Sequence, residues 1–177
     1  MVKKILVINL DQCIRCYACE IACKQENEVS VGPRWCRVIT IGPRRIHKKL
    51  VMDFVPTMCF QCDDPVCANF CPTNAIRKGE NGIVLIKEDA CTGCMSCVIG
   101  CPYGAIHFDQ KKGKVGKCNL CINRIDGGLD PSCVQHCIGE SLQIIAEDEL
   151  DHIIGNRHKV RIGQVCYTSG KWRLSDV

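Results

Sequence analysis

The sequence has few aromatic residues, since Phe, Trp and Tyr together make up 5% of its 177 residues. Aromatic side chains bury more apolar surface per residue than others, so an ordinary hydrophobic core has little large material here. We expect metal–ligand bonds to replace part of that core, because metal that binds only the folded chain adds its binding energy to folding.

Long apolar segments are also missing. No run approaches the roughly 20 residues that cross a bilayer. Residues 3–9 are too short an apolar run for a secretion signal, and Asp11 and Cys13 follow at once. Arg44-Arg45 lies too deep in the chain to be a twin-arginine signal. These absences predict a cytoplasmic protein.

Motifs for substrate chemistry are missing as well. No G-x-G-x-x-G follows an expected strand, so direct exchange with a dinucleotide is not expected. The glycine-rich loop 126–131 lacks a phosphate-loop pattern, and the five histidines are scattered without an H-E-x-x-H pair. We predict no catalytic residue on this chain, so a catalytic centre is expected on another one.

Cysteine, in contrast, is abundant, with 18 residues. Such a content indicates either a disulfide scaffold or metal binding. Disulfides need an oxidising compartment, whose export signal we do not find, so the cysteines are interpreted as metal ligands in a reducing compartment.

Sixteen of the cysteines form four runs of four. The runs are Cys13, Cys16, Cys19 and Cys23; Cys59, Cys62, Cys67 and Cys71; Cys91, Cys94, Cys97 and Cys101; and Cys118, Cys121, Cys133 and Cys137. The first and third have the C-x2-C-x2-C-x3-C spacing of bacterial ferredoxins, in which the fourth cysteine binds a different [4Fe–4S] cluster from the first three. Pro72 and Pro102 follow the second and third runs, where proline ends a short helical turn.

The fourth run is irregular, because eleven residues separate its two pairs. Taken alone, two such pairs make a zinc site the main alternative. The x3 spacing of the second pair and the three neighbouring ferredoxin-like runs favour a cluster instead.

The formal charge of +4 does not indicate a nucleic-acid partner. Sixteen thiolates on four oxidised cores of about 2+ each would bring the protein to about −4. The basic residues are therefore interpreted as compensation for cluster charge. Lys114 and Lys117 precede Cys118, where they either raise a cluster's potential or lie at the surface as ordinary solvated lysines.

The local pattern predicts short elements. Strands are expected at residues 3–9, 37–41, 50–55, 82–87, 106–108, 141–145 and 159–162, and helices at 24–28 and 147–154. The basic residues 44–49 are expected in a solvated hairpin between two strands, with a docking surface for an acidic partner as the alternative. Cys36 and Cys166 lie outside the runs and are expected as buried free thiols, and Trp35 and Trp172 as packing residues.

The whole pattern resembles a known family, the four-cluster iron–sulfur electron-transfer subunits of molybdenum or tungsten pterin oxidoreductases. The similarity covers about residues 6–145, and its most specific parts are residues 59–67 and 117–121. The family includes subunits of the dimethyl-sulfoxide-reductase and aldehyde-oxidoreductase kinds and of benzoyl-coenzyme-A reductase, with relatives in formate hydrogenlyase and carbon monoxide dehydrogenase.

The resemblance implies an α+β fold of interleaved bis-[4Fe–4S] ferredoxin-like modules with short strands and short helices. Residues 1–58 and 110–146 would form one module, residues 59–109 an inserted second module, and residues 147–177 a C-terminal extension. It also implies four ligand sets: Cys13, Cys16, Cys19 and Cys137; Cys23, Cys118, Cys121 and Cys133; Cys59, Cys62, Cys67 and Cys101; and Cys71, Cys91, Cys94 and Cys97. Ile138-Gly139 departs from the proline and threonine usual in the family after the last cysteine.

The implied function is electron transfer through four [4Fe–4S] clusters, as the iron–sulfur subunit of a multi-subunit oxidoreductase. A larger catalytic subunit with a tungsten or molybdenum pterin is the expected partner, with a further electron carrier as a second one and no nucleic acid. The short chain lacks the long insertions and membrane-docking tail of periplasmic relatives, which favours the cytoplasmic type. A free polyferredoxin, a hydrogenase or carbon monoxide dehydrogenase subunit, and a zinc-bound interaction module are the alternatives.

Overall fold

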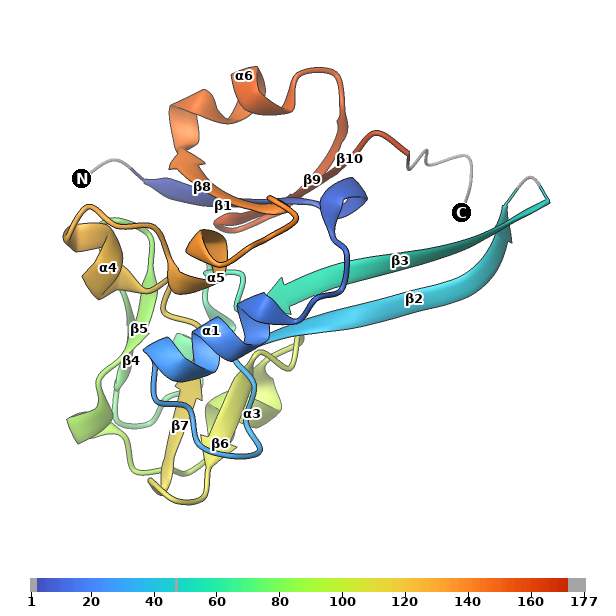
Figure 1. The fold of residues 1–177 in the computed structure, drawn as a ribbon. Helices are drawn as coiled ribbons and strands as arrows, with labels where there is room; N and C mark the ends of the chain where they lie inside the picture. Colours follow the sequence, from blue (N-terminus) through green and yellow to red (C-terminus); the bar gives the residue numbers. More distant parts are fainter. Residues whose placement is uncertain (1–2, 47, 172–177) are drawn as a thin grey trace.

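The computed structural model describes residues 3–46 and 48–171, and shows an α+β protein of short helices and strands (Figure 1). The helices are α1 (Ala18–Glu26), α2 (Val66–Asn69), α3 (Ser96–Gly100), α4 (Ile122–Asp126), α5 (Ser132–Gln135) and α6 (Leu150–Ile154), with 3-10 turns η1 (Leu10–Gln12), η2 (Glu88–Ala90) and η3 (Glu147–Glu149). The strands are β1 (Lys4–Asn9), β2 (Cys36–Ile46), β3 (Lys49–Met58), β4 (Ile76–Lys78), β5 (Val84–Ile86), β6 (Ile106–Asp109), β7 (Lys114–Lys117), β8 (Leu142–Ala146), β9 (His158–Ile162) and β10 (Val165–Ser169). The predicted class is confirmed.

One four-stranded sheet has the order β8-β1-β10-β9. Strand β1 is aliphatic and buried along its middle, as a central strand must be. It pairs antiparallel with β8 and parallel with β10, where Leu6 lies opposite Val165. The sequence predicted β1, β8 and β9 but missed β10. Strands β9 and β10, which follow residue 146, therefore complete the sheet in which β1 is a central strand (Figure 1).

The antiparallel hairpin β2–β3 forms a long arm that extends from the rest of the molecule (Figure 1). Both strands were predicted, but they are longer than expected. Arg44 and Arg45 belong to β2, with a register shift between Ile41 and Arg44, so the prediction that the whole basic stretch lies between the strands was wrong. The shift lets the ladder pass Gly42-Pro43, since proline lacks an amide donor.

Two small hairpins, β4–β5 and β6–β7, make up the other sheets. Strands β5 and β6 were predicted, but their partners β4 and β7 were not. Helix α1 also differs from its prediction, because it begins at Ala18 within the first cysteine run and ends at Glu26. Cys19 and Cys23 therefore lie on one helix, a turn apart.

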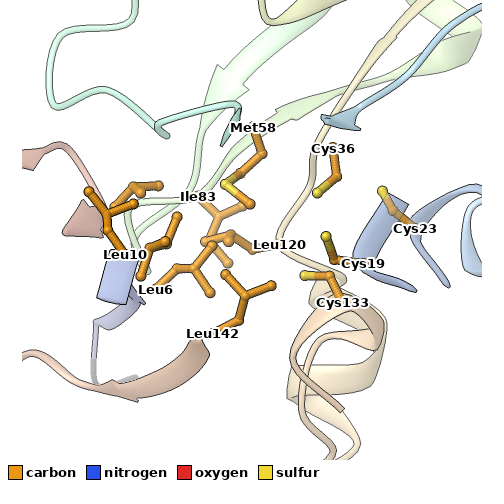
Figure 2. Packing of buried hydrophobic residues seen from close by; sticks show 12 residues of the cluster. Leu6, Leu10, Cys19, Cys23, Cys36, Met58, Ile83, Leu120, Cys133 and Leu142 are labelled. Carbon is orange, nitrogen blue, oxygen red and sulfur yellow. The ribbon is translucent and has the colours of Figure 1, made fainter. Parts of the chain in front are cut away.

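The largest buried cluster combines aliphatic side chains with cysteines. Figure 2 shows Leu6, Leu120 and Leu142 on one side and the sulfur atoms of Cys19 and Cys133 on the other. A second cluster lies around hairpins β4–β5 and β6–β7, and a third lies between β1 and α6. Trp35 packs against the first cluster as predicted, whereas Trp172 lies outside the described residues.

Within residues 3–46 and 48–171, no helix is long and apolar enough to cross a membrane.

Candidate iron–sulfur centres

Each cysteine run bends its backbone at the same point. The residue two positions after the first cysteine has a positive φ in all four runs, at Arg15 (60°), Gln61 (52°), Gly93 (72°) and Leu120 (53°). This left-handed conformation is uncommon outside glycine and points to a local constraint. It turns successive backbone N–H groups toward one side, as in the concave backbone nests that hold anions and iron–sulfur centres.

Gly93 is the one of these four positions where contacts also require glycine. A Cβ there would lie 2.4 Å from the carbonyl oxygen of Gly113. The loop after Cys91 therefore packs directly on the β6–β7 turn, which fixes its position over the hairpin.

Backbone amides donate to cysteine sulfurs by a repeated contact. The amide four residues after the last cysteine of a run donates to its Sγ, from Ala75 to Cys71 at 3.2 Å, from Ala105 to Cys101 at 3.5 Å and from Ser141 to Cys137 at 3.2 Å. The first run has no such bond; instead the Asn27 side-chain amide lies 3.9 Å from Cys23 Sγ and 4.0 Å from Cys121 Sγ. N–H donors stabilise thiolates, and they tune the potential of a cluster that the thiolates hold.

The sulfur atoms gather in four groups, each drawn from two runs. The Cys13 set is Cys13, Cys16, Cys19 and Cys137; the Cys23 set is Cys23, Cys118, Cys121 and Cys133; the Cys59 set is Cys59, Cys62, Cys67 and Cys101; and the Cys71 set is Cys71, Cys91, Cys94 and Cys97. Three of these sets each line a cavity. These are the groupings that the sequence resemblance implied, and ligation of a cluster by each stays a prediction.

Helix packing explains why the sets cross between runs. Helix α1 carries Cys19 and Cys23 and packs against α5, which carries Cys133. Likewise α2, which carries Cys67, packs against α3, which carries Cys97. Two runs that share a helix pair therefore exchange their last cysteines.

The four sets also lie in a definite order. Cys19 of the Cys13 set and Cys133 of the Cys23 set lie in one buried cluster (Figure 2). Cys118 lies beside Cys59, whose charge acts on its thiol. Finally, Cys67 and Cys97 belong to one buried cluster. The order is therefore the Cys13, Cys23, Cys59 and Cys71 sets.

Exposure singles out the two ends of this order. Cys16 in the Cys13 set and Cys94 in the Cys71 set are exposed, and every other cysteine is buried or half-buried. Each end set therefore contains one exposed cysteine, whereas the cysteines of the two central sets are buried or half-buried.

Burial makes free thiolates unfavourable at the central sets. It raises the pKa of the Cys118 thiol to about 12, with a further contribution from Cys59, and the pKa of the Cys67 thiol to about 11. A thiol in such a place loses its proton readily only when a positive metal core compensates the charge. The donor set therefore fits a metal cluster better than it fits reactive cysteines.

Each set consists of four cysteines, which is the number of ligands that a [4Fe–4S] cluster takes. Among residues 3–46 and 48–171, no group of three or more His, Cys, Asp or Glu side chains is arranged so that it could hold a single metal ion.

The structure also places the cysteines and lysines outside the four runs that the sequence singled out. Cys36, predicted as a buried free thiol, is buried but lies against Cys19 and lines the cavity of the Cys23 set. Cys166 is buried in the third cluster, away from the sets. Lys117 is 3% exposed, so the prediction of a surface lysine is wrong there. Lys114 donates to the carbonyl of Cys91, a different set from that of Cys118.

A family model described as "4Fe-4S dicluster domain" matches residues 50–147. The chain belongs to this family. Its members bind 4Fe-4S clusters, so the predicted cofactor class and the prediction of an iron–sulfur protein are confirmed.

Curated relatives carry names of reductase subunits. An anaerobic dimethyl sulfoxide reductase chain of Escherichia coli is 32% identical over 150 residues, and the match covers 81% of this chain and 73% of the relative. A Halobacterium salinarum protein named for the iron-sulfur subunit of a dimethyl sulfoxide reductase is 35% identical over 161 residues, 75% of this chain and 62% of the relative. A tetrathionate reductase subunit of Archaeoglobus fulgidus is 39% identical over 125 residues, 70% of this chain and 57% of the relative.

This chain thus spans between 57% and 73% of the length of these relatives. Their names describe single chains of multi-subunit reductases, one of them explicitly the iron–sulfur subunit. This supports the predicted class, an electron-transfer subunit without its own catalytic centre.

Proposed function

We propose that this chain transfers electrons through four [4Fe–4S] clusters, as the iron–sulfur subunit of a larger oxidoreductase. The observation that carries the proposal is the order of the four sets, with an exposed cysteine in each end set and only buried or half-buried cysteines in the two sets between them. Such an order provides an entry, an interior path and an exit for electrons.

The Cys13, Cys23, Cys59 and Cys71 sets are the proposed ligands of one cluster each. This assignment makes residues 1–58 and 110–146 one ferredoxin-like module and residues 59–109 a second, inserted module. Exchange of cysteines within the α1–α5 and α2–α3 pairs supports the division. Strand β10, which pairs with β1, attaches the C-terminal segment to the first module.

A bound [4Fe–4S] cluster supplies one-electron redox chemistry. The residues of this chain determine where each cluster lies and what reduction potential it has. Backbone amides donate to the sulfurs of Cys71, Cys101 and Cys137, and burial limits the contact of the central sets with water. Both are recognised means of setting a cluster's potential.

The proposed partner is a larger catalytic chain with a molybdenum or tungsten pterin. Relatives named for dimethyl sulfoxide and tetrathionate reductases favour this partner over a hydrogenase or carbon monoxide dehydrogenase. A free polyferredoxin is the second candidate, because two exposed end sets would serve it equally well. A cytoplasmic location for the complex stays a prediction from the sequence.

Native purification under anaerobic conditions tests the proposal. We expect the chain to elute with a larger protein, and the complex to contain molybdenum or tungsten besides iron. Mass spectrometry identifies the partner, and elemental analysis identifies the metal. A chain that elutes alone with its clusters intact under gentle conditions would instead support the free polyferredoxin.

A further inference from the structure

Lys117, at the end of β7, is a buried cation without a carboxylate partner. Its residue is 3% exposed, and among the ion pairs of the described residues none involves it. Burying an unpaired charge is costly, so a buried lysine needs a compensating negative group or gives up its proton.

The surroundings of Lys117 favour the charged form. Its Nζ donates to Gln61 Oε1 at 3.4 Å, to the carbonyl oxygen of Cys118 at 3.1 Å and to the carbonyl oxygen of Val84. An ammonium has three N–H donors, and three acceptors surround it, whereas a neutral amine has only two. The hydrogen bonds thus match a protonated lysine.

Gln61 hydrogen-bonds to the same two residues, Cys118 and Val84, and so holds this arrangement together. Its side chain is fully buried, and it donates through Nε2 to the carbonyl of Cys118 at 2.7 Å and accepts from the amide of Val84 at 2.8 Å. The amide therefore joins the strand β5 to the start of the fourth cysteine run and holds its oxygen toward Lys117. Because both polar atoms of the Gln61 side chain are hydrogen-bonded, its oxygen is held in one place, and this fixes the position of the ammonium beside it.

That position lies between two of the cysteine sets. Lys117 directly precedes Cys118 of the Cys23 set and donates to its carbonyl oxygen. Its partner Gln61 lies in the loop between Cys59 and Cys62 of the Cys59 set. The charge of Lys117 also acts on the thiols of Cys62, Cys67 and Cys118. These are the two central sets of the proposed order. No comparable buried cation contacts either end set among the described residues, since Lys114 is only half-buried.

We infer that Lys117 is a shared counter-ion of the two central clusters and raises the reduction potentials of both. The inference rests on the proposed four-cluster function. Reduction adds one negative charge to a cluster, and a nearby ammonium in a medium of low dielectric stabilises that charge. Lys117 would thus stabilise the reduced clusters in the middle of the path, where the cysteines are less exposed than at the two ends.

A redox titration of the full-length, cluster-loaded protein, followed by electron paramagnetic resonance, tests this role. In Lys117→Met, which removes the charge but keeps an unbranched apolar stem, two of the four cluster signals should shift to lower potential. We expect at least a tenfold fall in their reduction equilibrium constant, which is 59 mV for one electron. The reduction potentials of the two end clusters should change by only a small fraction of that shift.

Two further variants sharpen the test. Gln61→Glu places a carboxylate against the ammonium without removing it, and should shift the same two signals in the same direction. Lys112→Met removes one exposed positive charge from the β6–β7 turn and should shift none. Iron content measured on each variant shows that all clusters are present.

The outcomes separate this inference from the proposed function. A wild-type chain without four clusters would refute the function itself, before any potential is compared. Four intact clusters whose potentials are unchanged in Lys117→Met, or shifted equally at all four, would overturn the inference alone. Loss of a central cluster in both Lys117→Met and Gln61→Glu would also overturn it, because Lys117 would then act in assembly.

Discussion

Cys137 shows how little of the local sequence a cluster loop requires. Ile138-Gly139 follows it where Pro72 and Pro102 follow the corresponding cysteines. Even so, the amide of Ser141 donates to Cys137 Sγ at 3.2 Å, the same contact that Ala75 makes to Cys71. The departure from the family pattern therefore leaves the amide–sulfur geometry intact, and Cys137 lies with the other cysteines of the Cys13 set.

The crossed assignment of ligands can be tested at two cysteines four residues apart. Cys137→Ser should damage the cluster of the Cys13 set, although Cys13 is more than a hundred residues away in sequence. Cys133→Ser is the matched variant and should damage the cluster of the Cys23 set. Electron paramagnetic resonance and iron content of each variant would show which signal is lost. Loss of the same signal in both variants would mean that the fourth run serves a single cluster.

Gly93 and Gly113 form a matched pair for a test of backbone contact. Both have positive φ, so alanine strains both positions alike. Only at Gly93 would the new Cβ meet backbone, at 2.4 Å from the Gly113 oxygen, whereas nothing lies within 4 Å of a Cβ at Gly113. We expect Gly93→Ala to lose or distort the cluster of the Cys71 set and Gly113→Ala to lower stability by about 1 kcal/mol with all clusters retained. Equal cluster loss in both variants would show that backbone strain, and not the contact with the Gly113 oxygen, causes the loss.

At the scale of elements, strands rich in apolar residues were predictable and short polar strands were not. Strand β1 and the hairpin β2–β3 have enough β-branched and aliphatic residues to show a pattern. Strands β4 and β7 are as short as β5 and β6, which were predicted, but each has a single hydrophobic residue, and pairing with β5 and β6 forms them. Tertiary contacts, which a sequence pattern does not contain, determine these elements.

Strand β10 was missed for another reason. Its register with β1 depends on groups far apart in sequence, such as Asp11, which accepts from the Ser169 hydroxyl and the Gly170 amide, each at 2.7 Å, and from Arg157 at 3.1 Å. Cysteine spacing indicates the four runs, and the resemblance to the family implies the ligand sets. The same spacing contains no information on Lys117 or Gln61, whose roles come from the way β5 and β7 meet.

Asp11 should therefore hold the end of β10 in place. Burial alone would raise its pKa, but the hydrogen bonds from Gly170 and Ser169, with the charges of Lys171 and Arg157, hold the pKa below the usual 3.8. A lowered carboxyl pKa stabilises the fold above pH 3.8, and this contribution is lost as the pH falls through the folded-state value. Asp11→Asn should thus weaken β10 by about 1 kcal/mol.

Hydrogen exchange measured by mass spectrometry checks this prediction. Residues 165–171 should exchange about fivefold faster in Asp11→Asn, equally between pH 5 and pH 8, because the carboxylate is ionised throughout. Asp151→Asn is the control, since Asp151 pairs with Lys159 on the surface and surface pairs contribute little. Unchanged exchange in β10 would show that pairing with its neighbouring strands alone holds β10 in place.

On the scale of the whole molecule, the cysteine sets take the place of a large apolar core. The largest buried cluster contains Cys19, Cys23, Cys36 and Cys133 among its aliphatic members (Figure 2). Cluster binding would then contribute directly to folding, as it does for other structural metals. The same sets place one exposed cysteine at each end and two buried or half-buried sets between, so the groups that complete the core would also form the path for electrons.

The iron and sulfide content of the anaerobically purified chain tests this account most directly. Four sets of four cysteines predict about sixteen iron and sixteen sulfide per chain, with a brown colour that reductant bleaches. Assays for iron and acid-labile sulfide, normalised to protein by amino-acid analysis, give both numbers from one preparation. Reproducible values near eight, or a colourless protein that contains zinc, would contradict a four-cluster path.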